Sequence, residues 1–154
     1  MTQAPLKTYL DAIAANIKAG NATEHTHRPA LKSLLEAIGA QTGATDILAT
    51  NEPQRIACGA PDYIVTRGLL PLGYVEAKDI GISLDKTASS DQLKRYRESL
   101  PNLILTDYIE FRWFVDGQCQ LTASLPRPDK NGKVRWNEAR SEEHTSELQS
   151  LVII

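Results

Sequence analysis

The sequence has no apolar run that approaches the ~18 to 20 residues needed for a membrane-spanning helix. Its first seven residues contain no basic region followed by an apolar stretch, so no secretion signal is visible. The two cysteines, Cys58 and Cys119, are far apart and form no CxxC pair, which argues against a disulfide framework or a zinc knuckle. We therefore expect a cytoplasmic protein in which both cysteines are small buried apolar residues.

The chain also lacks a charge excess once its end is set aside. Residues 140–150 resemble the in-frame translation of a sequencing-library adapter, and we interpret residues 140–154 as an artefactual tail; a native polar tail is the alternative. Leaving them out removes one of 17 basic and three of 19 acidic residues, so 16 of each remain. A neutral domain has no overall electrostatic footprint for nucleic acid, so any DNA contact must come from local clusters.

No glycine-rich phosphate loop, Ser-His-Asp arrangement, internal repeat or low-complexity tract is present. What is present is the composition of one globular domain with a real core: 42% of the 154 residues are hydrophobic and 23% are charged. We expect this domain to cover residues 1–125. The Pro- and Lys-rich residues 126–139 are predicted to be a linker toward missing downstream domains.

Apolar residues recur at helical spacing in two early segments and predict amphipathic helices over residues 5–19 and 29–39. Residues 40–55 show no clean period, and we expect a loop there with a short strand near residues 46–50. A third helix is predicted over residues 89–99, before Pro101, and a loop over residues 81–88.

The period changes to two after residue 55 and predicts strands over residues 63–66 and 72–78, joined as a hairpin by a loop over residues 67–71. A buried strand is expected over residues 102–106. A second hairpin over residues 110–115 and 118–123 turns at Asp116-Gly117. Helices before and between these strands predict a mixed α/β (α+β) domain, a mixed sheet flanked by helices.

Three charged residues of the first hairpin form the candidate site. Glu76 and Lys78 are two apart on a strand and therefore project to the same face, whereas Val75 and Ala77 face the apolar side. If the two strands pair, Asp62 lies beside the end of the second strand. Two carboxylates and a strand carbonyl are the hard oxygen ligands that Mg²⁺ favours, and a nearby ammonium can orient water and offset charge on a phosphate. The pattern predicts metal-assisted phosphodiester hydrolysis.

The alternative is structural. Asp62 then caps a turn after Pro61, and Glu76 and Lys78 form the solvated face of an exposed strand.

Pro61-Asp62 and Glu76-Ala77-Lys78 resemble the two halves of the signature of the PD-(D/E)xK nuclease superfamily. Further segments are similar to the N-terminal nuclease domain of type ISP-like single-chain restriction–modification enzymes, over roughly residues 5–125. They are Thr23-Glu24, Arg28-Pro29-Ala30-Leu31, Asn51-Glu52-Pro53, Cys58-Gly59-Ala60, Asp79-Ile80 and Leu105-Thr106-Asp107.

The resemblance implies a restriction-endonuclease-like fold, with Asp62, Glu76 and the Ala77 main-chain carbonyl as Mg²⁺ ligands and Lys78 as the catalytic lysine. It also implies downstream translocase and adenine-N6 DNA methyltransferase domains, to which any ATP and S-adenosylmethionine belong. Family members place a further acid near the metal on an early helix. Glu24 is the matching residue and Glu36 its rival; an acid favoured by a helix start is the alternative for Glu24.

Gln92 and Tyr96 are similar to a Gln-x-x-x-Tyr motif that borders the metal site in exonuclease-like members, and one helical turn separates them. A capping box is the alternative, with the Gln92 side chain reaching back to the Ser89 amide. Basic residues on or near this helix are candidates for DNA phosphate contacts, with a solvated helix face as the alternative: Lys86, Lys94, Arg95 and Arg97.

The histidines and Trp113 each have a structural and a functional interpretation. His25 and His27 are expected to be polar loop residues, with a metal role as the alternative. Trp113 is expected to lie on a strand with one face in the core rather than to stack on bases.

The sequence thus favours a Mg²⁺-dependent endonuclease that acts on double-stranded DNA. A non-cleaving module that positions DNA for a methyltransferase is the second hypothesis, and a structural N-terminal cap is the third.

Overall fold

The computed structural model describes residues 4–135. Its helices are α1 (Ala4–Ala19), the 3-10 helix Glu24–His27, α2 (Arg28–Gln41), α3 (Leu84–Ala88) and α4 (Asp91–Ser99). Its strands are β1 (Ile47–Asn51), β2 (Tyr63–Arg67), β3 (Leu70–Ala77), β4 (Asn102–Thr106), β5 (Glu110–Val115) and β6 (Gln118–Ser124).

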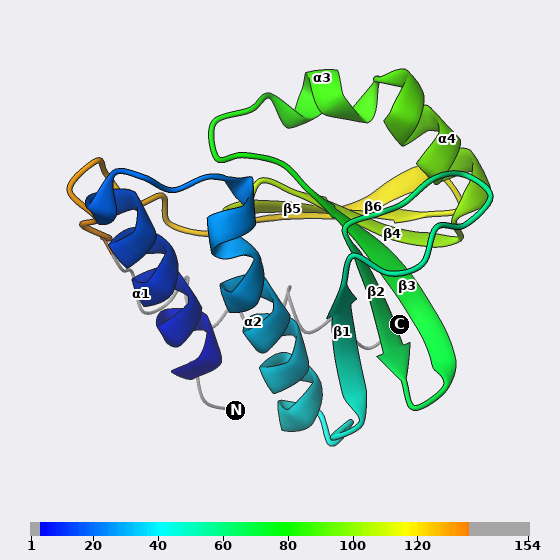
Figure 1. Ribbon diagram of the computed structural model, residues 1–154, viewed down its shortest axis with the longest axis horizontal. Helices are drawn as coiled ribbons and strands as arrows, with labels where there is room; N and C mark the ends of the chain where they lie inside the picture. Colours follow the sequence, from blue (N-terminus) through cyan, green and yellow to red (C-terminus); the bar gives the residue numbers. More distant parts are fainter. Residues whose placement is uncertain (1–3, 136–154) are drawn as a thin grey trace.

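The strands form one six-stranded sheet in the order β1-β2-β3-β4-β5-β6 (Figure 1). Neighbouring strands are antiparallel except β3 and β4, which pair in parallel with Val75 opposite Ile104. A parallel pair needs a crossover connection, and here it carries α3 and α4. The expected first hairpin is confirmed, since Tyr63 of β2 pairs with Val75 of β3.

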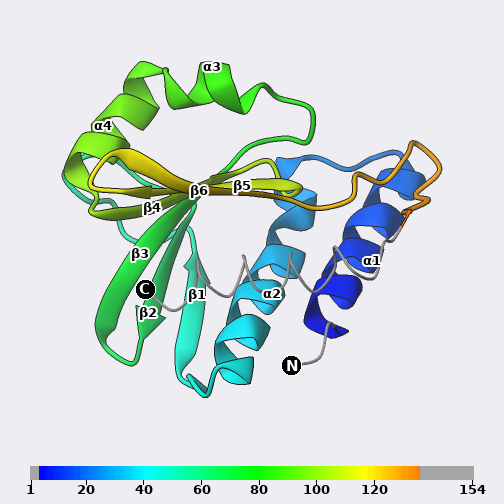
Figure 2. The same ribbon diagram turned by 180° about the vertical axis from the view of Figure 1, so that it is seen from behind.

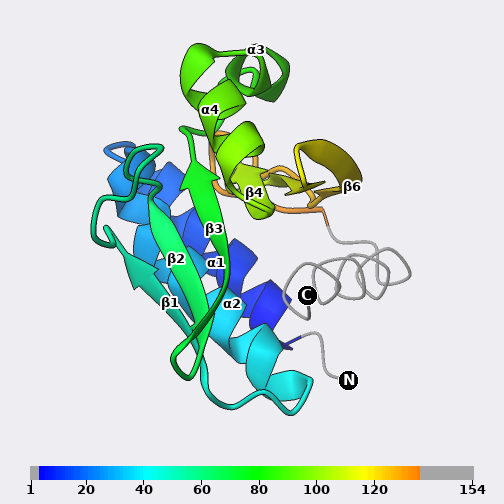
Figure 3. The same ribbon diagram turned by 90° about the vertical axis from the view of Figure 1, so that its right-hand side faces the viewer.

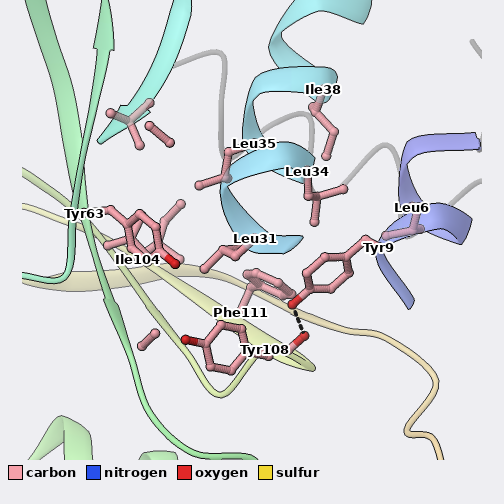
Figure 4. Close-up of a cluster of buried hydrophobic side chains, with 14 of the residues drawn as sticks. Leu6, Tyr9, Leu31, Leu34, Leu35, Ile38, Tyr63, Ile104, Tyr108 and Phe111 are labelled. Carbon is pink, nitrogen blue, oxygen red and sulfur yellow. Dashed lines mark hydrogen bonds between the residues drawn. The ribbon is translucent and has the colours of Figure 1, made fainter. Parts of the chain in front are cut away.

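Helices α1 and α2 cover one face of the sheet, and α3 and α4 lie on the other (Figures 1 and 2). The larger core cluster joins the apolar sides of α1 and α2 to β-strand residues such as Tyr63, Val75 and Ala77. Figure 4 shows Tyr9 of α1 at the centre of this cluster, where its hydroxyl donates to the Tyr108 carbonyl at 2.5 Å. This buried bond satisfies two polar groups within the core.

A second, smaller cluster joins the crossover helices to the sheet. Figure 3 shows α3 and α4 on this side of the strands. Its fully buried members include Leu93 of α4 and Leu103 and Leu105 of β4. With both faces covered, the chain forms a single α+β domain, and the predicted mixed sheet flanked by helices is confirmed.

Most element predictions are confirmed within one to three residues. The strand at residues 102–106 and the first strand of the second hairpin have the predicted bounds. The turn between β5 and β6 is formed by Asp116 at φ 48° and Gly117 at φ 83°, the left-handed pair typical of an Asp-Gly hairpin.

The loop expected over residues 81–88 is wrong in part, because its second half is helix α3. The Ser83 hydroxyl caps this helix by accepting from the Lys86 amide at 3.3 Å. Leu84 is buried in the second core cluster. A five-residue helix is too short to show a period in the sequence.

The loop expected over residues 67–71 is also shorter than predicted. Arg67 pairs directly with Leu70, so the hairpin turns within Gly68-Leu69 and β3 begins at Leu70. Gly68 has φ 60°, which a residue without Cβ adopts most easily.

The prediction that both cysteines are buried is wrong. Cys119 is exposed on the edge strand β6, and Cys58 is half-buried in the β1–β2 connection. No helix within residues 4–135 combines the length and apolarity needed to cross a bilayer. The predicted tail at 140–154 lies outside the described residues, as do residues 136–139 of the predicted linker.

Candidate functional site

The antiparallel pairing of β2 and β3 brings Asp62 and Glu76 together. The Asp62 amide donates to Glu76 Oε1 at 3.2 Å, and the Ala77 amide donates to Asp62 Oδ2 at 2.8 Å. Glu76 is thus bonded to the backbone of Asp62, and Asp62 is bonded to the backbone of the residue that follows Glu76. This reciprocal arrangement fixes two acidic side chains at the open end of the hairpin.

Glu76 is buried, with 4% of its side chain exposed, and Lys78 Nζ lies 3.5 Å from its Oε2 atom. Burial and the neighbouring Asp62 carboxylate raise the pKa of Glu76 to about 8, and the Lys78 ammonium opposes this shift. Val75 and Ala77 lie in the core on the opposite face, as expected from the strand period. Asp62, Glu76 and Lys78 thus lie together.

Arg28, at the start of α2, is the residue of this cluster to which the sequence analysis assigned no role. Its Nη2 atom lies 2.9 Å from Asp62 Oδ1 and 3.2 Å from Glu24 Oε1. Its Nη1 atom lies 3.2 Å from both Glu52 Oε1 and Asn51 Oδ1. One guanidinium therefore links the start of α2, the end of β1 and the start of β2.

A signal for Arg28 exists in the sequence. A cation in the first turn of a helix faces the positive end of the helix dipole, so an arginine there needs acidic partners. Glu52 and Asp62 supply them from 24 and 34 residues away, a separation that local pattern analysis does not reach.

The structure places Glu24 and Glu36 apart. Glu24 shares Arg28 Nη2 with Asp62 and therefore lies beside the cluster. Glu36 Oε2 instead accepts from Lys32 Nζ at 2.6 Å and from the Ala49 amide at 2.9 Å, between α2 and β1. Of the two rivals, Glu24 is the one that the fold brings to Asp62.

Gln92 and Tyr96 contact each other on α4, where Gln92 Nε2 donates to the Tyr96 hydroxyl at 3.3 Å. The alternative capping box is wrong, because the cap is Ser90, whose hydroxyl accepts from the Leu93 amide at 3.3 Å. Tyr74, two residues before Glu76 on β3, packs against the core cluster that contains Tyr96, so this pair lies on the Glu76 side of the sheet. Burial, and next the Glu76 carboxylate, raise the pKa of Tyr96.

The four basic candidates for DNA contact differ in their surroundings. Lys86, Lys94 and Arg95 are exposed on α3 and α4. Arg97 instead donates to the Gly117 carbonyl at 2.9 and 3.2 Å and to the Ala88 carbonyl at 3.2 Å, and its guanidinium lies 4.8 Å from the Phe114 ring centre. The first three are free to meet a ligand, while Arg97 holds α4 to the sheet.

The two histidines lie in the 3-10 helix Glu24–His27. His27 is buried, with its ring 5.1 Å from that of Tyr108, so it is a core residue rather than an exposed loop residue. Burial lowers the pKa of His27, and the charge of Asp79 opposes this shift. Trp113 is half-buried and donates to Asn102 Oδ1 through its indole nitrogen, a structural role on β5.

Within residues 4–135, no group of three or more His, Cys, Asp or Glu side chains is arranged to hold a metal ion. The expected set is smaller: the Asp62 and Glu76 carboxylates and the Ala77 carbonyl. Two adjacent carboxylates and a main-chain carbonyl are the hard oxygen donors that Mg²⁺ prefers, although Arg28 and Lys78 already contact the two carboxylates. This donor chemistry fits a divalent cation such as Mg²⁺.

A groove of about 420 Å³ lies beside the 3-10 helix that carries Glu24. Its walls include Thr23, which precedes Glu24, His27 at the end of the same 3-10 helix, and Asp79, which follows Lys78. Arg127 and Lys130 also line it. Asp62, Glu76 and Lys78 are not among the residues that line this groove, so it is a neighbour of the candidate site rather than part of it.

The sheet order, the two helical layers and the single domain define a restriction-endonuclease-like fold, the class expected from the sequence. No protein-family description matches the chain, and no curated protein matches its sequence. Among solved structures, the cryo-electron-microscopy structure of a DrdV–DNA complex matches with a TM-score of 0.69 and 18% identity, over 98% of this chain and 13% of that chain. At this identity the likeness shows the fold alone.

Proposed function

We propose that the chain is a Mg²⁺-dependent DNA endonuclease domain of the PD-(D/E)xK class. The observation that carries this proposal is the meeting of Asp62, Glu76 and Lys78 at the open end of the β2–β3 hairpin. A structural cap on an exposed strand does not require a buried glutamate beside a second carboxylate, because burying a charge without compensation is costly.

In this proposal, Asp62, Glu76 and the Ala77 carbonyl hold Mg²⁺. When bound there, the ion activates water and neutralises charge on a phosphodiester. Lys78 holds its ammonium on the same side as Glu76, where it orients the attacking water and stabilises charge developing on the phosphate oxygens. Glu24 borders the centre through Arg28, and Gln92 borders it from α4.

Double-stranded DNA is the proposed substrate. The matching fold occurs in a DrdV–DNA complex, which supports this choice. The exposed side chains of Lys86, Lys94 and Arg95 supply contacts to phosphates. Such contacts give binding that is independent of sequence and weakens as salt increases.

The parent protein in this proposal is a type ISP-like restriction–modification enzyme with downstream translocase and adenine-N6 methyltransferase domains. ATP and S-adenosylmethionine would bind in those domains. The small share of the DrdV chain that matches is consistent with a nuclease domain within a much longer polypeptide.

Plasmid nicking tests the proposal. The full chain is incubated with supercoiled DNA and Mg²⁺ or Mn²⁺, and Asp62→Asn and Lys78→Ala should each lower the nicking rate by about 100-fold or more. Asp11→Asn and Lys7→Ala, matched changes at exposed positions of α1, should nick like the wild type. Equal nicking by Lys78→Ala and Lys7→Ala would remove the catalytic assignment.

A non-cleaving DNA-positioning module is the second candidate. It is favoured by the fact that both oxygens of Asp62 already accept protein hydrogen bonds, from Arg28 and from the Ala77 amide. This candidate predicts salt-sensitive DNA retention in a mobility-shift assay, unchanged by Lys78→Ala, and no nicking with either metal ion.

A further inference from the structure

Arg28 is a buried cation inside a group of oxygen atoms. Its side chain is 7% exposed, and its two Nη atoms face Glu24, Glu52, Asp62 and the amide oxygen of Asn51 at 2.9 to 3.2 Å. These oxygens belong to four residues in three separate segments of the chain. Three carboxylates at such distances repel each other unless a positive charge lies between them.

The guanidinium is not fully satisfied in this position. Its Nε atom is buried and has no hydrogen-bond partner among the described residues. Leaving a buried donor unpaired costs free energy. We infer that attraction to the surrounding oxygens outweighs this cost and determines where the guanidinium lies.

Glu52 gives an independent indication that this arrangement is held against resistance. Its φ is 50°, a left-handed conformation that non-glycine residues seldom adopt. The Glu52 amide donates to the Asp62 carbonyl at 2.8 Å. The Glu52 side chain is 72% exposed, and its carboxylate nevertheless contacts Arg28. Backbone strain of this kind concentrates at functional sites.

We propose that Arg28 is the resident cation of this oxygen cluster, holding Glu24, Glu52 and Asp62 in the metal-free protein and competing with a divalent cation for the oxygens of Asp62 and Glu24. Both oxygens contact the same Nη2 atom. A cation that binds either of them therefore meets the guanidinium directly. Arg28 is a positioning residue, since it is too buried to touch DNA.

The proposal rests on the proposed function, because Asp62 is shared between Arg28 and the Mg²⁺ ligand set. It also makes a claim of its own. Without the guanidinium, the Asp62 and Glu24 oxygens that now contact Nη2 lose their positive partner, and carboxylate oxygens are the ligands that divalent cations prefer. Removing Arg28 should therefore create a stronger cation site while destabilising the metal-free protein.

The test compares the full-length wild type with Arg28→Met and Arg28→Lys by thermal unfolding, with chelator and then with about 1 mM Mn²⁺. Electron paramagnetic resonance measures the concentration of free Mn²⁺ and therefore how much Mn²⁺ each protein binds. Arg67→Met is the matched control, since Arg67 forms an exposed ion pair with Asp46 at 3.4 Å at the far end of β2. The Mn²⁺-induced rise in melting temperature should be at least about 3 °C greater in Arg28→Met than in the wild type.

Arg28→Lys should show an intermediate Mn²⁺ effect, because one ammonium has three donors for four acceptors.

If Arg28→Met does not fold, Arg28→Lys is compared with the wild type. A larger Mn²⁺ effect in the lysine variant then supports the proposal, and an equal or smaller one overturns it. If Arg28→Met folds, a Mn²⁺ effect no greater than that of the wild type overturns it. A wild type that binds no Mn²⁺ counts against the proposed function, while the variants still decide the role of Arg28.

Discussion

Asp62 and Glu76 are joined by a reciprocal pair of contacts across β2 and β3. The Asp62 amide donates to Glu76, and the Asp62 carboxylate accepts from the Ala77 amide directly after Glu76. Because Arg28 also binds Asp62 at 2.9 Å, this carboxylate connects the hairpin to α2. The candidate site is therefore part of what holds the fold together.

Replacing Asp62 should destabilise the metal-free protein. Asp62→Ala leaves the Ala77 amide and Arg28 without this acceptor, and we expect a loss of about 2 kcal/mol in the free energy of unfolding. Asp62→Asn keeps one acceptor oxygen and should lose less. Urea denaturation in chelator measures both. Asp46→Ala, which breaks an exposed ion pair, is the control and should lose less than about 1 kcal/mol.

Stability in chelator should fall as the pH rises toward 8. The pKa of Glu76 is raised to about 8 by burial and by Asp62, above the usual value of 4.5. The folded state therefore binds a proton that the unfolded state releases. The stability that this proton gives is fully present below about pH 4.5 and is lost as the pH rises through 8.

Glu76→Gln removes this titration. It should flatten the pH dependence of the melting temperature between about pH 5 and 8, the window between the unfolded and folded pKa values of Glu76. Glu98→Gln, a change at an exposed position of α4, is the matched control. A wild type and a Glu76→Gln variant with the same slope would contradict the assignment of the raised pKa to Glu76.

The β1–β2 connection should be sensitive at Gly59. A Cβ at this position would lie 3.0 Å from the Tyr96 hydroxyl and Cε1 atoms, and φ is 138°. Gly59→Ala should therefore displace Tyr96 and lower the free energy of unfolding by about 2 kcal/mol. Gly81→Ala separates strain from crowding, since Gly81 has φ 96° but no atom within 4 Å of a Cβ. Equal losses in the two variants would show that contact with Tyr96 is unimportant.

The meeting of Asp62 and Glu76 could be predicted from the sequence because it follows from two short-range features. Turn residues between two strands specify a hairpin, and the strand period places Glu76 and Lys78 on one face. The role of these residues as metal ligands stays a prediction.

Contacts that depend on distant segments could not be predicted in this way. Arg28 meets Glu52 and Asp62 only because β1 and β2 pair next to the start of α2. Cys119 lies on the edge strand, and a composition rule for buried cysteines carries no information on strand order. The choice between Glu24, in the 3-10 helix, and Glu36, on α2, likewise depends on which of these segments packs beside Asp62.

The basic residues of α4 should separate into a structural and a DNA-binding group. Arg97→Ala removes three hydrogen bonds to carbonyls and the contact with Phe114, so it should lower the free energy of unfolding by about 1 to 2 kcal/mol. Lys94→Ala and Arg95→Ala alter exposed side chains and should change stability by less than about 0.5 kcal/mol.

DNA binding should show the opposite order. If Lys94 and Arg95 each contact a phosphate, each alanine variant should reduce the slope of log K against log salt by about 0.9, with equal effects on unrelated DNA sequences. Fluorescence anisotropy with labelled duplexes at several salt concentrations measures this slope, and Lys7→Ala on α1 is the matched control. A slope that changes for Arg97→Ala but not for Lys94→Ala or Arg95→Ala would mean that DNA approaches a different face, because Arg97 is turned toward the Gly117 carbonyl while the other two face solvent.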